Sequence, residues 1–73
     1  MIGLMWYDPS PKKAQAEKIA QAAGLFQEKY GKPATICMVR IGSPEDTPAG
    51  IALRFRKYIL TNHFYVGIEE DQK

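Results

Sequence analysis

The chain has one cysteine and one histidine among its 73 residues, and this scarcity limits the chemistry it can perform. A single cysteine excludes an internal disulfide, and Cys37 with His63 supplies too few ligands for a zinc site. The sequence also lacks a glycine-rich phosphate loop, a metal-ligand cluster and a catalytic motif. A thiol enzyme built from Cys37 and His63 would need adjacent strands and an oxyanion site, which the sequence does not indicate. We therefore expect a non-catalytic protein without a cofactor.

Long apolar runs are missing as well. No segment is long enough to span a bilayer, and Ile2–Tyr7 is too short for a signal peptide and lacks a basic leader. A free thiol without an export signal favours a cytoplasmic location and no membrane partner. The net charge of +2 and the pI of about 8.8 permit an acidic partner without requiring one.

One amphipathic helix stands out in what the sequence does contain. Asp8 or Ser10 can cap its first turn, where the adjacent prolines are also tolerated. Gly31 can adopt the left-handed conformation that ends a helix, and Pro33 prevents its continuation. The sequence therefore predicts a helix that begins near residues 8–11 and ends at residue 31.

This helix has an apolar stripe that we expect to face a sheet. Its residues recur at alternating steps of three and four: Ala16, Ile19, Ala23, Phe26 and Tyr30. The remaining surface carries the polar side chains, and Lys18 is assigned to it. The alanines allow the helix backbone to approach the sheet closely.

Four segments have the composition of strands: Ile2–Tyr7, Ala34–Ile41, Ile51–Arg56 and His63–Ile68. Clean alternation of apolar and polar residues favours a strand over a helix in the third segment. The last two strands should be antiparallel neighbours joined by a hairpin at residues 58–62. The predicted fold is an α+β domain with one α-helix packed on a small mixed sheet of three to four strands, in the order β-α-β-β-β.

The whole chain, residues 1–73, is predicted to be one small domain. Residues 42–50 carry two prolines and no apolar anchor, so we expect an exposed, mobile loop. Residues 69–73 should form a polar tail at the end of the domain.

A single helix is too narrow to cover both faces of such a sheet, so the second face needs an explanation. Ala34–Ile41 is apolar on both faces, and tyrosine and arginine are favoured at protein contacts. The candidate interface consists of Met38, Val39, Arg54, Arg56 and Tyr65. A domain of this size also has a small core, and association would add burial. We expect the chain to form a symmetric homodimer. A different protein is the other partner that we consider for this face.

Nucleic-acid binding is the alternative function for the same face. Arg54, Arg56, Tyr58 and Tyr65 could contact phosphates and stack on the bases of a single strand. The same residue types are also common as cross-strand pairs on the solvent-exposed face of a sheet, where they keep the protein soluble. A pI near 8.8 is lower than is usual for a nucleic-acid-binding domain, so this alternative is less favoured.

Three segments carry a resemblance: MWYDPSPKKAQAEKIAQAA at 5–23, EKYGKPATICMV at 28–39 and LTNHFYVGIEE at 60–70. With them the chain resembles short uncharacterised prokaryotic proteins in which tyrosine, aspartate and proline open a helix and an NHF segment lies near the C-terminus. The resemblance covers most of the chain and implies no activity, cofactor or partner.

Overall fold

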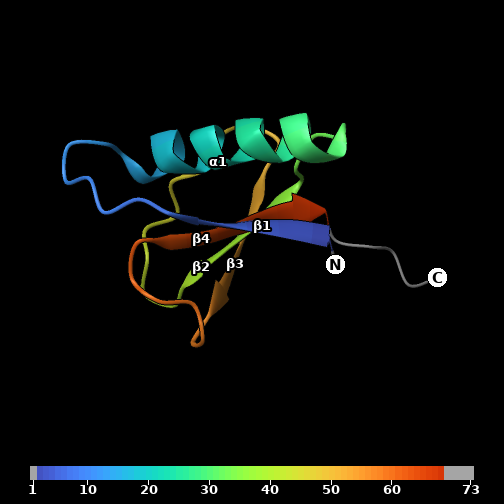
Figure 1. The fold of residues 1–73 in the computed structure, drawn as a ribbon. Coiled ribbons are helices and arrows are strands. Elements are labelled where there is room, and N and C mark those ends of the chain that lie inside the picture. The colour runs from blue at the N-terminus through green and yellow to red at the C-terminus, as the bar shows by residue number, and fades with distance from the viewer. Residues whose placement is uncertain (1, 69–73) are drawn as a thin grey trace.

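One helix lies on one face of a four-stranded sheet in the computed structural model, which describes residues 2–68 (Figure 1). The elements follow the chain in the order β1 (Ile2–Tyr7), α1 (Gln15–Tyr30), β2 (Ile36–Arg40), β3 (Ala52–Arg56) and β4 (His63–Ile68). This arrangement confirms the predicted α+β class and the β-α-β-β-β order. The tail predicted at residues 69–73 lies outside the described residues.

The strand order in the sheet is β1-β4-β2-β3. β4 runs antiparallel to both of its neighbours, whereas β2 and β3 are parallel. β1 and β2 are therefore parallel strands with β4 inserted between them, and α1 connects them. The prediction that the last two strands form a hairpin is wrong, because β2 separates β3 from β4. Alternation along a strand indicates which face is buried but not which strand is the neighbour.

α1 begins later than predicted but ends where expected. Its N-cap is Ala14, whose amide donates a hydrogen bond to Glu17 Oε1 at 3.1 Å, and residues 8–13 form a separate loop. The helix ends at Gly31, which has a left-handed φ of 73° and donates its N–H to the Gln27 carbonyl oxygen at 2.8 Å. Glycine allows this closure because it has no Cβ.

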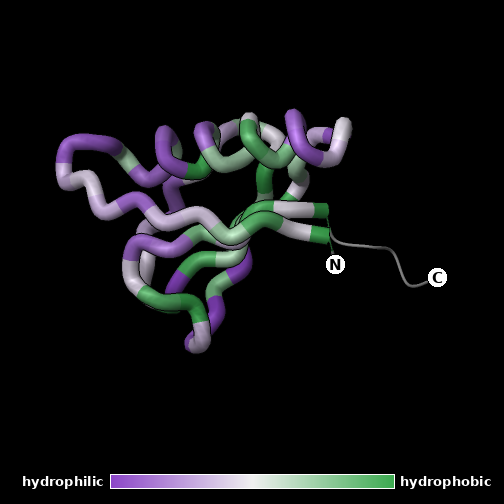
Figure 2. The backbone as a smooth tube through the Cα atoms, in the orientation of Figure 1, coloured by the Kyte–Doolittle hydropathy of each residue, from purple (hydrophilic) through white to green (hydrophobic). Residues whose placement is uncertain are grey.

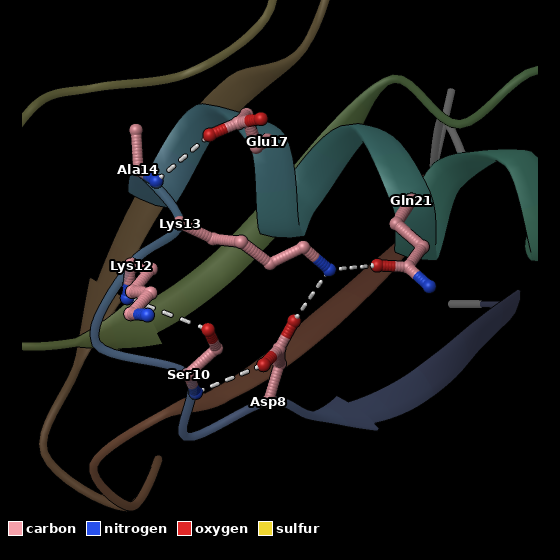
Figure 3. Close-up of polar contacts among 7 residues, drawn as sticks. All are labelled: Asp8, Ser10, Lys12, Lys13, Ala14, Glu17 and Gln21. Atoms are coloured by element: carbon pink, nitrogen blue, oxygen red, sulfur yellow. Dashed lines mark hydrogen bonds and ion pairs between the residues drawn. The ribbon is translucent and has the colours of Figure 1, made fainter.

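The loop before α1 is organised by Asp8 (Figure 3). Its carboxylate accepts hydrogen bonds from the Ser10 backbone N–H at 3.0 Å and from Lys13 Nζ at 3.1 Å. Lys13 also donates to the Gln21 side chain, which ties the loop to α1. The pKa of Asp8 is lowered, first by the hydrogen bond from Ser10. Asp8 therefore caps a turn before the helix and not the helix itself.

The buried stripe of α1 shares Ile19 and Phe26 with the predicted one but differs from it at other positions. Its buried residues are Lys18, Ile19, Ala22 and Phe26, whereas Tyr30 is 38% exposed. The assignment of Lys18 to the solvent-facing surface is therefore wrong. Figure 2 shows hydrophilic and hydrophobic stretches alternating along the helix, as expected for a helix with one buried side.

The hydrophobic core lies between α1 and one face of the sheet. Its buried members are Ile19, Ala22, Phe26, Ala34, Cys37, Val39, Phe64 and Val66. Cys37 and Val66 are paired in register on β2 and β4, the two inner strands, and neither is exposed to solvent. The two inner strands therefore carry the centre of the core, with α1 above them.

Residues 42–50 are tethered to the first turn of α1. Gln15 Nε2 donates to the carbonyl oxygens of Pro44 at 2.8 Å and Asp46 at 3.0 Å. The Asp46 carboxylate accepts a hydrogen bond from the Ala16 N–H at 3.1 Å. A carboxylate at a helix N-terminus satisfies a free amide and complements the helix dipole. Polar contacts therefore hold this loop against α1, although its sequence provides no apolar anchor.

β1 and β4 approach each other closely at a pair of glycines. Gly3 and Gly67 are opposite each other in the register. A Cβ at Gly67 would fall on the Ile2 carbonyl oxygen and 2.8 Å from the Gly3 Cα. The atoms in the way belong to the backbone, so they could move only if the two strands separated.

Replacing Gly67 with alanine is expected to destabilise the fold by about 1–3 kcal/mol, the usual cost of overpacking. Gly24→Ala is the matched control, because nothing lies within 4 Å of its Cβ position and alanine is favoured over glycine in a helix by about 1 kcal/mol. Chemical denaturation of both variants measures the two free energies of unfolding. A Gly67→Ala variant as stable as the wild type would contradict the close approach of β1 and β4.

Candidate functional site

The face of the sheet opposite α1, called the open face below, is not covered by a helix within residues 2–68 (Figure 1). Strand pairing aligns one residue from each strand in a row across this face: Met5, Tyr65, Met38 and Arg54. The residues that precede and follow them in each strand point to the core. The row therefore crosses the full width of the sheet on its uncovered side.

Aromatic and thioether side chains form the middle of the open face. Met5 is 49% exposed, and the ring of Tyr65 lies where a Cβ at Gly3 would be, with Cζ 2.6 Å from that position. Tyr58, which follows β3, donates its hydroxyl to Met38 Sδ at 3.4 Å and is itself 69% exposed. Met5, Met38, Tyr58 and Tyr65 are called the Met–Tyr strip below.

Arginines border the Met–Tyr strip at the β3 edge. Arg54 Nη1 donates to the Leu53 carbonyl oxygen at 3.2 Å, and Arg56 Nη1 donates to the Phe55 carbonyl oxygen at 2.9 Å. The Ala52 N–H donates a hydrogen bond to the Thr35 carbonyl oxygen, just before β2. Successive residues of a strand direct their backbone groups to opposite sides, so the carbonyls of Leu53 and Phe55 point away from β2. The two guanidinium groups thus cover unpaired carbonyls on the outer edge of the sheet, which protects that edge from pairing.

The structure brings most of the predicted site residues together, but not through the predicted hairpin. Met38 is flanked by Tyr65 on one side and Arg54 on the other, and Arg56 is paired with Arg40. Val39 is the exception: it points to the core and is 1% exposed, so its place in the candidate interface is corrected. The apolar character of β2 on both faces had left its orientation open.

Two residues of β1 on the open face were missed in the sequence, because the neighbour of β1 was unknown. Met5 extends the central row, and Tyr7 packs its ring on that of His63, with ring centroids 4.7 Å apart. His63 Nδ1 lies 2.9 Å from the Thr61 carbonyl oxygen, consistent with an Nδ1–H that donates to it. Ile2–Tyr7 is apolar without clear alternation, so its sequence did not indicate which of its residues lie on the open face.

Cys37 and His63 do not form a nucleophile–base pair. Cys37 points to the core and pairs in register with Val66, whereas His63 is paired with Tyr7 at the other end of β4. Burial raises the pKa of the Cys37 thiol to about 12, against a smaller lowering effect of a hydrogen bond from the Tyr65 backbone. The thiol therefore remains protonated at neutral pH, and a protonated thiol is a poor nucleophile.

Within residues 2–68, no group of three or more candidate ligands is placed to hold a metal ion. No helix in this part of the chain combines the length and apolar character needed to cross a membrane. Comparison of the chain with protein-family models, with curated proteins and with solved structures gives no match. The function is therefore inferred from the geometry of the open face.

The buried thiol predicts a pH dependence of stability. Above pH 9.0 the Cys37 thiol ionises in the unfolded chain but not in the folded one, whose pKa is about 12. The free energy of unfolding should therefore fall as the pH rises through this range, by at most about 1.4 kcal/mol per pH unit. Denaturation of the wild type and of Cys37→Ala across this range measures the effect. A stability difference between the two that does not change with pH would contradict it.

Proposed function

We propose that this chain is a non-catalytic interaction module that self-associates through its open face. The observation that carries the proposal is the Met–Tyr strip, which exposes thioether and aromatic surface over the centre of the sheet. Methionine and tyrosine are enriched at protein interfaces, and charged residues are depleted from their centres. The strip has this composition, with Arg54 and Arg56 at its border.

Charge favours one relative orientation of the two copies. If the twofold axis lies parallel to the strands, β1 of one copy stacks on β3 of the other, and Arg54 lies against Met5. If the twofold axis is parallel to the sheets but runs across the strands, β3 of one copy stacks on β3 of the other, and the arginines of the two copies meet. Opposed like charges at an interface are costly, so we propose the parallel axis. β4 of each copy then lies over β2 of the other.

Replacing Met38 with glutamate is expected to weaken the dimer at least tenfold, or by about 1.4 kcal/mol, because it places a charge at the centre of the interface. Light scattering coupled to size exclusion, over a wide range of protein and salt concentrations, measures the association. Leu25→Glu, on the solvent side of α1 and 37% exposed, is the matched control and should remain a dimer. A wild-type chain that is monomeric at all concentrations would overturn the proposal.

Charges introduced at position 5 test the orientation. With the parallel axis, Met5→Glu places its carboxylate near Arg54 of the second copy, whereas Met5→Lys places a second cation there. The dimer of Met5→Glu should therefore be about tenfold tighter than that of Met5→Lys, and added salt should reduce the difference. The double variant Met5→Lys with Arg54→Glu should recover association. Equal affinities of the two position-5 variants would exclude this orientation while leaving the interface itself in place.

Single-stranded nucleic acid is the second candidate partner. Tyr58 and Tyr65 offer rings for base stacking, and none of the strand residues on the open face is acidic. The hydrogen bonds of Arg54 and Arg56 to edge carbonyls weigh against it, because phosphate contacts would have to replace them.

Binding of a labelled oligonucleotide at several salt concentrations distinguishes the two functions. If nucleic acid is the partner, affinity should fall steeply with salt and should be lost when both arginines are replaced with glutamine. A salt-insensitive dimer without oligonucleotide binding would support self-association alone.

A further inference from the structure

Lys18 is the one buried charged residue in the part of the chain that the structure describes. It lies in the second half of the first turn of α1, on the side that faces the sheet, and is 7% exposed. The stem of a lysine can be buried while its ammonium remains in contact with water. Within residues 2–68, Trp6 Nε1 is the one enclosed side-chain nitrogen or oxygen without a hydrogen-bond partner, so the Lys18 ammonium, which forms no hydrogen bond in this part of the chain, is in contact with solvent.

Asp8 does not neutralise Lys18. The pKa of Asp8 is lowered chiefly by the Ser10 hydrogen bond, and attraction to Lys18 is the smallest of the contributing effects. Both carboxylate oxygens are also engaged, one by the Ser10 backbone and the other by Lys13. The charge of Lys18 therefore remains available to a group from outside the protein.

Lys18 lines a cavity of about 300 Å³ at the end of the sheet where β2 finishes and β4 begins. Its walls come from α1, from the end of β2 and the segment after it, and from the start of β4 and the segment before it: Gln15, Lys18, Arg40, Ser43, Pro44, Thr61, Asn62, His63 and Phe64. This volume is at the lower end of the range for small-molecule sites, roughly 300–1,000 Å³. The lining includes two basic residues, Lys18 and Arg40, and no acidic residue.

The lining also provides hydrogen-bond donors suited to an anion with several oxygens. Arg40 Nη1 donates a hydrogen bond to the Ile59 carbonyl oxygen at 3.3 Å. A guanidinium group has five N–H donors in all. The hydroxyls of Ser43 and Thr61 lie among the lining residues. Lysine and arginine are the usual residues for phosphate recognition.

We propose that this cavity binds the phosphate group of a small organic molecule, with Lys18 and Arg40 as its two cations. A phosphate monoester carries close to two negative charges at neutral pH, which matches these two side chains. The site lies at the end of the sheet and is independent of the Met–Tyr strip. The Met38→Glu variant, in which we expect a weakened dimer, should therefore bind phosphate as the wild type does.

Substitution can separate the charge of Lys18 from the packing of its buried stem. Methionine keeps an unbranched stem and removes the charge. We therefore expect Lys18→Met to abolish the rise in melting temperature that phosphate produces in the wild type, while its melting temperature in phosphate-free buffer changes little. A lysine needed only for the packing of its stem would leave the phosphate-induced rise unchanged in Lys18→Met.

Titration of ¹⁵N-labelled protein with inorganic phosphate and with glycerol phosphate tests the proposal. The amide signals of residues around the cavity should shift and saturate, and chloride at equal ionic strength should not reproduce the effect. Lys18→Met and Arg40→Gln should each weaken binding at least tenfold. Lys12→Met is the matched control, because Lys12 is exposed and the net charge changes equally.

Two results would overturn the proposal. One is a set of shifts that never saturates or that spreads over the whole surface. The other is an equal loss of binding in Lys12→Met and Lys18→Met, which would indicate a general electrostatic effect. Arg40 is exposed, so Arg40→Gln keeps the test decisive if the Lys18 variant does not fold.

Discussion

The insertion of β4 between β1 and β2 is the constraint on which the rest of the structure depends. Two parallel strands need a long crossover connection, and α1 provides it on one face of the sheet. β4 fills the space between them, and its Gly67 permits the close approach of β1. The same insertion aligns Tyr65 with Met5 and Met38 on the opposite face. The Met–Tyr strip is therefore a consequence of strand order, not of any local motif.

Features encoded by neighbouring residues were predictable, whereas the order of the strands was not. Gly31 identified the end of the helix, and apolar composition or alternation located every strand to within about two residues. A strand alternates in the same way beside any neighbour, so no local pattern separated a hairpin from the observed arrangement. The error over Val39 has a related cause. An inner strand that is apolar on both faces does not reveal which face points to the core.

Lys18 shows how a charged residue can mislead the assignment of a helix face. The predicted stripe passed through Ala16, Ala23 and Tyr30, and the observed one includes Lys18 and Ala22. The two stripes share Ile19 and Phe26, and the charge of Lys18 led to its assignment to the solvent-facing surface. A lysine can bury its stem on the sheet-facing side of a helix when its ammonium reaches solvent. At Lys18 the cavity beside the helix provides that access.

The two edges of the sheet support the proposed association through a face over pairing at an edge. At β3, Arg54 and Arg56 occupy the outward carbonyls of Leu53 and Phe55, so another strand would have to displace charged hydrogen bonds. At β1, the Tyr30 hydroxyl approaches the Gly3 carbonyl oxygen at 3.5 Å, so a side chain from the end of α1 stands beside that edge. The open face has no such obstruction at its centre. Burying aromatic and thioether surface there would leave both edges as they are, which makes stacking of two sheets the less costly route to a dimer.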